Sequence, residues 1–237
     1  MMKPPFLAGC TLMLCAFAAN AQQLNDTTFV ATAKERAVQF YTQTIGVQSA
    51  LYEGSEYKEY IALRDEFPYM HDDVVYGNVK YNRELYKNVP LYFDLEKDQI
   101  ITSYPHGNKV QLLREKVEYF DLDGHRFVLL QGQKVNDGFY DLLYDGKLKF
   151  YARRTKVRVL KVNSNGGDAT RVFEARNKYF VLKNGVYHVV KSKRSVLALL
   201  SDKKRDLKRA LRTENTKFGR EREKTITLLL KHYEQIK

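Results

Sequence analysis

The sequence has no tryptophan and only two cysteines, Cys10 and Cys15. Both lie within residues 1–21, which we interpret as a cleavable secretory signal peptide. Lys3 precedes an apolar run from Phe6 to Ala19, and small residues stand at the expected cleavage position. Removal of this segment leaves a mature chain without cysteine, which excludes disulfides and thiol nucleophiles. The fold must then rest on its apolar core, for which the 44% hydrophobic residues of the full sequence suffice.

Long hydrophobic runs are missing as well. A bilayer-spanning helix needs about 20 consecutive apolar residues, and neither the run in the signal peptide nor any later segment reaches that length. We therefore expect no transmembrane span. Leu7 to Cys10 resembles a lipoprotein cleavage box, but this box precedes most of the apolar run, which argues against lipidation. The predicted location is the periplasm or the outer membrane of a bacterium, with an extracellular location as the alternative.

Patterns that mark catalysis are absent from the sequence. It contains no Gly-x-Ser-x-Gly, no phosphate loop and no dinucleotide fingerprint. The five histidines lack the i, i+4 spacing that puts two metal ligands on one helix face. We therefore predict no catalytic, cofactor-binding or metal residues and no cofactor, and we favour a protein that is not an enzyme. A weak site candidate, with a metal or acid-base role, is the loop cluster His71, Asp72 and Asp73.

Basic residues are concentrated near the C-terminus, where most of the net charge of +12 arises. Residues 191–237 carry 15 Lys or Arg against 6 Asp or Glu, whereas residues 22–190 carry 24 against 22. Such a basic segment attracts anionic lipids, cell-wall polymers and acidic proteins through the same screened field. No nucleic-acid reader motif accompanies it, so nucleic acid is not an expected partner. The candidate contacts for an anionic surface are Lys203, Lys204, Arg205, Lys208, Arg209 and Arg212.

The middle of the chain has a β pattern. Short runs rich in Val, Ile, Leu, Tyr and Phe alternate there with Gly, Asn and Asp. This pattern predicts an antiparallel fold of successive hairpins with about 10–12 short strands. Asp123-Gly124, Asp145-Gly146 and Asn184-Gly185 predict tight turns because they tolerate positive φ angles, and residues 163–168 predict a loop. The expected strands are residues 74–80, 85–93, 98–103, 109–113, 116–121, 125–131, 138–144, 147–153, 156–162, 171–175, 178–183 and 186–191.

Helical periodicity flanks this β region on both sides. Thr32 to Glu35 forms a capping-box pattern, so we expect one helix over residues 33–45, packed on the body. Apolar residues recur at helical spacing after Ser195 and again over residues 220–235, which predicts a docked helical pair with its basic side toward solvent. The predicted domains are a signal peptide at 1–21, an N-terminal helix and connecting segment at 22–73, a β body at 74–191 and a basic helical tail at 192–237.

Three segments rich in aromatic and turn residues carry a resemblance. They are Leu51 to Tyr57 (LYEGSEY), Tyr86 to Asp94 (YKNVPLYFD) and Gly138 to Gly146 (GFYDLLYDG). Together with the Lys-rich helical tail, they resemble a family of uncharacterised exported bacterial proteins with a β-rich fold. The resemblance covers nearly the whole mature chain. It implies export, a β-rich fold and bacterial origin, and it brings no activity with it.

Two functions follow from these patterns. The charge asymmetry and the missing catalytic motifs favour an exported, non-enzymatic envelope protein, an interaction module that uses its β-rich body and its basic tail. Its partner would be an envelope protein or an anionic envelope surface or polymer, with peripheral membrane contact allowed. The alternative is a carbohydrate-binding or polysaccharide-hydrolysing module, because 17 Tyr and 13 Phe can line a sugar platform. Carboxylate pairs for hydrolysis are assembled in space and leave no spacing signal.

Overall fold

The computed structural model describes residues 26–45, 51, 53–59, 67–103, 108–132, 134–162, 169–213 and 218–236. The predicted signal peptide and the predicted loop at residues 163–168 lie outside these residues. The chain divides into two compact units, Met1–Thr44 and Ile45–Lys237. Within the described ranges, no helix is long and apolar enough to cross a membrane.

Helix α1, Asp26–Ile45, forms almost all of the described part of the first unit. It begins at Asp26 rather than at residue 33, so Thr32 lies inside the helix and does not mark its start. Neither Gly nor Pro interrupts the segment, which is consistent with a helix longer than the predicted one. Phe29 and Phe40 of α1 are exposed. The expected packing of this helix on the body stays a prediction.

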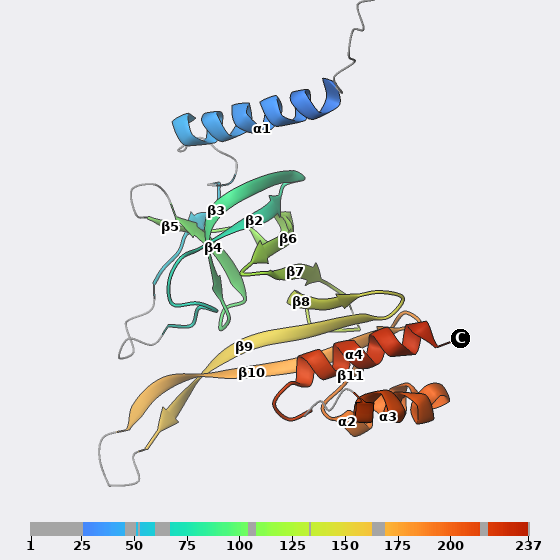
Figure 1. Ribbon diagram of the computed structural model, residues 1–237. Coiled ribbons are helices and arrows are strands. Elements are labelled where there is room, and N and C mark those ends of the chain that lie inside the picture. Colours follow the sequence, from blue (N-terminus) through green and yellow to red (C-terminus); the bar gives the residue numbers. More distant parts are fainter. Residues whose placement is uncertain are drawn as a thin grey trace, which may run out of the picture. The chain divides into compact units, whose positions relative to one another are not determined.

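In the described part of the second unit, eleven strands form one antiparallel sheet (Figure 1). The strands are β1 Ser55–Glu56, β2 Val75–Tyr81, β3 Glu84–Asp94, β4 Gln99–Ser103, β5 Lys109–Gln111, β6 Val117–Leu122, β7 His125–Leu130, β8 Gly138–Asp145, β9 Lys149–Lys161, β10 Thr170–Lys183 and β11 Val186–Val189. Their order is β1-β5-β4-β3-β2-β6-β7-β8-β9-β10-β11. The predicted fold class, mainly antiparallel β with an N-terminal helix and C-terminal helices, is confirmed.

Two pairs of predicted strands are single long strands in the structure. Residues 147–153 and 156–162 were expected to be separate, but they form β9, and β10 likewise joins 171–175 to 178–183. Charged and polar residues interrupt the apolar pattern at these places without ending either strand. The two strands pair without a break in register from Leu182 opposite Lys149 to Thr170 opposite Lys161. Strand β1 was not predicted, because two residues carry no periodic signal.

The turn predictions differ in outcome. Asp123 and Gly124 have φ values of 49° and 75°, and Asn184 and Gly185 have 53° and 74°, so both dipeptides adopt the left-handed conformation of tight hairpins. Asp145-Gly146 behaves differently. Asp145 is the last residue of β8, and the amide of Gly146 donates to the carbonyl of Leu148 over 3.0 Å, which gives a wider turn.

Two large apolar clusters hold the second unit together, beside a small one of Tyr57, Tyr69 and Ile101. The first lies among strands β2–β4 and β6–β8, where the buried rings of Phe93, Phe120 and Phe127 contact one another. The centroids of Phe120 and Phe127 are 4.8 Å apart and the rings are stacked. The second cluster joins Phe150 and Val181 of the sheet to leucines of the C-terminal helices. These phenylalanines therefore form core and not a surface platform for sugars.

Three α-helices replace the predicted helical pair. They are α2 Lys193–Leu199, α3 Lys204–Thr213 and α4 Arg222–Gln235, and short 3-10 turns occur at Ser201–Lys203 and, earlier in the chain, at Arg114–Lys116. Leu200 ends α2 with φ −107° and ψ 40°. Ser201 and Asp202 follow, residue types that favour helix starts over helix interiors. Buried leucines of the helices share an apolar cluster with residues of β8, β9 and β10.

Candidate functional site

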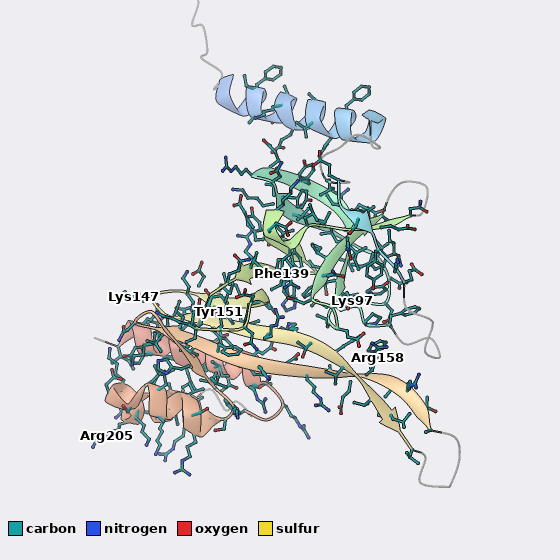
Figure 2. The ribbon with its side chains drawn as sticks, turned by 180° about the vertical axis from the view of Figure 1, so that it is seen from behind. Lys97, Phe139, Lys147, Tyr151, Arg158 and Arg205 are labelled. Atoms are coloured by element: carbon teal, nitrogen blue, oxygen red, sulfur yellow. The ribbon has the colours of Figure 1, made fainter. Side chains whose placement is uncertain are left out.

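The exposed side of α3 carries most of the predicted contact residues. Leu207 and Leu211 are one turn apart and buried, so they fix which side of the helix faces the apolar cluster. The cations occupy the opposite side, and Figure 2 shows Arg205 pointing away from the body. The exposed residues of the predicted set are Lys204, Arg205, Lys208, Arg209 and Arg212.

Helix α2 adds two cations that the sequence analysis missed. Lys193 and Arg194 open this helix and are exposed. A groove of about 360 Å³ lies between α2 and α3, with the buried side chain of Leu197 in its lining. Its other lining residues are Lys193, Arg194, Lys204 and Lys208. The groove therefore combines an apolar patch with four positive charges.

These four cations have no internal counter-charge in the parts of the chain that the structure describes. Helix α2 has no acidic residue in its first turn, where Lys193 and Arg194 stand. Positive charge at a helix N-terminus opposes the helix dipole, at a cost of some tenths of a kcal/mol for each exposed residue. The positive charge of Lys193 and Arg194 therefore does not stabilise the helix in which they stand.

Lys203 differs from the other predicted contact residues. It is half-buried and its ammonium group donates to the carbonyl oxygens of Tyr233 and Ile236 at the end of α4. The same group lies 5.1 Å from the centre of the Tyr233 ring. A cation at this place satisfies terminal carbonyls and complements the helix dipole. Lys203 is therefore a helix cap rather than part of the exposed basic surface.

The three residues of the weak candidate cluster at His71 do not form a joint metal site in the described part of the chain. The Nε2 atom of His71 lies 3.4 Å from a carboxylate oxygen of Asp123, in the turn between β6 and β7. Asp72 and Asp73 are exposed. Among the described residues, no group of three or more His, Cys, Asp or Glu side chains is arranged to hold a metal ion. His71 therefore pairs with a residue that its sequence neighbourhood did not indicate.

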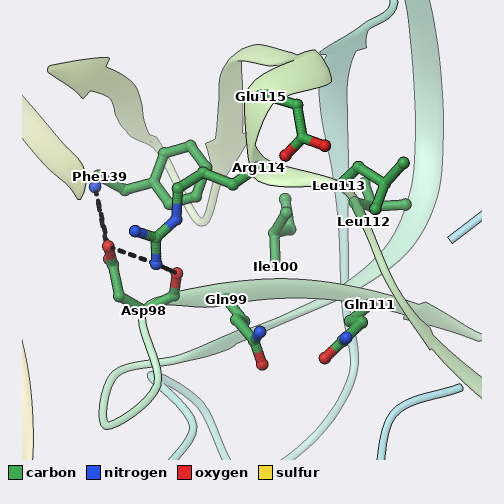
Figure 3. Close-up of a pocket in the computed structure, with 9 residues that line it drawn as sticks. All are labelled: Asp98, Gln99, Ile100, Gln111, Leu112, Leu113, Arg114, Glu115 and Phe139. Atoms are coloured by element: carbon green, nitrogen blue, oxygen red, sulfur yellow. Dashed lines mark hydrogen bonds and ion pairs between the residues drawn. The ribbon is translucent and has the colours of Figure 1, made fainter. Parts of the chain in front are cut away.

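A pocket of about 220 Å³ lies beside β4 and β5 (Figure 3). One wall is the Asp98 carboxylate, whose Oδ2 atom lies 2.9 Å from Arg153 and 3.2 Å from Arg114. The amide of Phe139 also donates to this carboxylate, at 3.3 Å. Burial raises the pKa of Asp98, and the two guanidinium groups limit that rise. The carboxylate is held as the centre of an ion-paired cluster.

Further polar side chains line this pocket beside the apolar Ile100, Leu112 and Leu113. Gln99 and Gln111 line it together with Glu115, and Figure 3 shows the two carboxamides pointing to the same side of the sheet. The Oε1 atom of Gln99 is buried and accepts no hydrogen bond from any described residue. Sequence periodicity does not reveal this pocket, because its members come from a β-turn, the three strands β4, β5 and β8, and the 3-10 turn at Arg114–Lys116.

A charged network joins the sheet to α4. Asp141 is buried, and its Oδ2 atom accepts hydrogen bonds from Nδ1 of His125 at 2.8 Å and from Nε of Arg154 at 2.7 Å. Arg154 also bonds both carboxylate oxygens of Glu223, each at 3.1 Å, and the Tyr179 hydroxyl donates to Glu223 at 2.9 Å. The hydrogen bond to Asp141 raises the pKa of His125. These groups neutralise one another and crosslink β7, β8, β9 and α4.

Of the sites found here, only the basic surface has a sequence signal. The cations of α3 follow from its helical period, whereas the Asp98 pocket and the Asp141 network depend on strand pairing. Comparison with known proteins assigns a function to none of these three sites. No family model, no curated protein and no solved structure matches the chain.

Proposed function

We propose that the protein is an exported, non-enzymatic envelope protein that binds an anionic partner through its C-terminal helices. We call the contact surface the basic face, and it consists of Lys193, Arg194, Lys204, Arg205, Lys208, Arg209 and Arg212. The observation that carries this proposal is the groove between α2 and α3, where four cations that form no ion pair with any other described residue surround Leu197. Export and bacterial origin come from the signal peptide pattern and from the family resemblance.

The physical strength of such a contact depends on the number of charges and on salt. Each Lys or Arg near an anionic surface contributes about 1 kcal/mol, and the field decays over a Debye length of about 8 Å at physiological salt. Because the cations of the basic face lie on one surface of two adjacent helices, they act on a partner together. Binding should therefore be lost steeply as salt concentration rises.

Reversal of four of these charges tests the proposal. The variant Lys204→Glu, Arg205→Glu, Lys208→Glu, Arg209→Glu should lose its salt-sensitive association with bacterial envelope fractions in a sedimentation assay. All four side chains are exposed, so the melting temperature should change little. Association that is unchanged by the reversal would overturn the proposal.

The matched control reverses four exposed cations elsewhere and changes the net charge by the same amount. These control residues are Lys58, Arg83, Lys87 and Lys147. Association should persist in the control variant, because the basic face is intact. An equal loss in both variants would show that net charge, and not this surface, governs association.

A second candidate function, carbohydrate binding, is favoured by the Asp98 pocket. Carboxamides and carboxylates are the groups that bind sugar hydroxyls, and Gln99, Gln111 and Glu115 line the pocket together. The buried oxygen of Gln99 has no partner among the described residues, and it would accept a hydrogen bond from a hydroxyl group once the carboxamide turns toward the ligand. Asp98 is already held by two arginines, which favours binding over hydrolysis at this place.

A glycan array followed by titration of any ligand tests this second function. Gln99→Leu should weaken binding about tenfold, because one buried hydrogen bond to the ligand is lost. Gln131→Leu is the control, since Gln131 is exposed and outside the pocket. Absence of any glycan ligand, or equal affinity of the Gln99 variant, would remove this candidate.

A further inference from the structure

Strands β9 and β10 extend beyond the rest of the sheet as a two-stranded ribbon (Figure 1). β9 pairs with β8 only as far as Ala152, and β10 pairs with β11 only from Phe180 onward. The two strands remain paired with each other from there to Lys161 and Thr170. We call residues 154–162 and 170–178 the ribbon. Its outer part is supported by one strand pair alone.

The inner part of the ribbon is nevertheless braced against the body. Lys156 donates from its side chain to the carbonyl of Tyr69 at 2.6 Å and from its backbone amide to Leu95 at 3.1 Å. Arg158 forms an ion pair with Glu96 at 2.6 Å. These contacts fix the direction of the ribbon, so its outer end is presented in a defined position.

The outer end of the ribbon exposes apolar side chains among cations. Leu160 is 61% exposed and Val162 is 70% exposed. Lys161 lies between them in sequence, and Arg171 stands opposite Leu160 in the strand pairing. Exposed apolar residues near the end of an unsupported ribbon contribute nothing to the core. Apolar side chains next to basic residues match the chemistry of a bilayer interface, where acyl chains lie beneath anionic headgroups.

The basic face lies toward the same end of the body. In both views, the outer end of the ribbon and helix α3 lie away from β2 and β3, on opposite sides of that end of the body (Figures 1 and 2). A flat surface that approaches this end can therefore meet both. A hydrophilic polymer would match the cations but offers no apolar phase for Leu160 and Val162. An anionic lipid bilayer matches both features.

We propose that the partner is an anionic lipid surface, and that Leu160 and Val162 insert into its interfacial region while the basic face contacts the headgroups. This inference rests on the proposed function and specifies its partner. Lys161 and Arg171 lie beside the inserted side chains at headgroup level. Attachment is peripheral, with electrostatic contact through the helices and apolar contact through the ribbon.

The absence of tryptophan from the chain allows a direct test of insertion. Leu160→Trp introduces a single tryptophan at the outer end of the ribbon. Its emission should shift to shorter wavelength on addition of vesicles made from equal parts of phosphatidylcholine and phosphatidylglycerol. It should not shift with dextran sulfate, a soluble polyanion. Val189→Trp is the control, because Val189 is 51% exposed on β11 and is not part of the ribbon.

A second variant measures what insertion contributes to binding. Leu160→Ser with Val162→Ser should lower the partition coefficient onto these vesicles about tenfold, since part of two apolar side chains stays in water. Val186→Ser with Val189→Ser should leave it unchanged. Vesicle binding without an emission shift and without an effect of the serine variant would overturn the lipid inference but leave the proposed function standing. Envelope association that survives reversal of the basic face would instead overturn the proposed function.

Discussion

At the scale of single residues, Gly138 decides whether the Asp98 cluster can form. Its φ of 149° lies outside the range that other residues readily adopt. A Cβ atom there would lie 1.9 Å from Nη1 of Arg153 and 2.3 Å from Oδ2 of Asp98. The missing side chain therefore leaves room for a buried ion pair, and the pocket beside it depends on this glycine.

Gly138→Ala should destabilise the protein by about 2–4 kcal/mol, because backbone strain adds to displacement of a buried ion pair. Urea denaturation measures this difference. Gly185→Ala is the control, since Gly185 also has a positive φ, 74°, but a Cβ there meets nothing within 4 Å. It should cost only about 1 kcal/mol. Equal effects of the two variants would mean that displacement of the ion pair at Asp98 does not change the free energy of unfolding.

At the scale of elements, the sequence predicted strands wherever apolar alternation and turn residues coincided. It divided β9 and β10 wrongly, because Arg154 and Asn177 break the apolar pattern in the middle of each strand. In the structure, Arg154 forms ion pairs with Asp141 and Glu223, so this charged residue is accommodated within an unbroken strand. The pattern of apolar and polar residues in a sequence cannot by itself distinguish such a residue from a turn.

The basic face shows the same division between local and non-local signals. The cations of α3 were predictable, because Leu207 and Leu211 define the buried side of the helix. The groove was not, because it depends on the break at Leu200 that sets α2 beside α3. Lys193 and Arg194 were missed for a related reason, since they precede the first apolar residue of helical period. The sequence does not distinguish Lys203 from the neighbouring cations, because its role depends on the carbonyl groups at the end of α4.

At the scale of the whole molecule, the second unit has two cores that share strand β8. Phe139 belongs to the cluster among β2–β8, whereas Leu143 packs against the cluster beneath the helices. The network of His125, Asp141 and Arg154 crosses between these regions and reaches Glu223 on α4. Its charge state should therefore affect the stability of the whole unit and not only one turn.

The pH dependence of this network follows from His125. Its hydrogen bond to Asp141 raises the pKa of the imidazole above 6.5, against the opposing effects of burial and of Arg154. A group whose pKa is raised on folding stabilises the folded state fully below its unfolded pKa. This contribution is lost as pH rises through the folded-state pKa. The charged groups that face the imidazole are Asp141, Arg154 and Glu223.

His125→Gln should therefore reduce the free energy of unfolding more at pH 5 than at pH 9. Urea denaturation of both proteins across this range gives the difference at each pH, which removes the effect of the other four histidines. His188→Gln is the control, because His188 takes no part in the network, and its difference from the wild type should stay flat. A flat difference for His125→Gln as well would show that Asp141 is satisfied by Arg154 alone. The two cores would then be joined by the ion pairs of Arg154 with Asp141 and Glu223, without any contribution from the imidazolium.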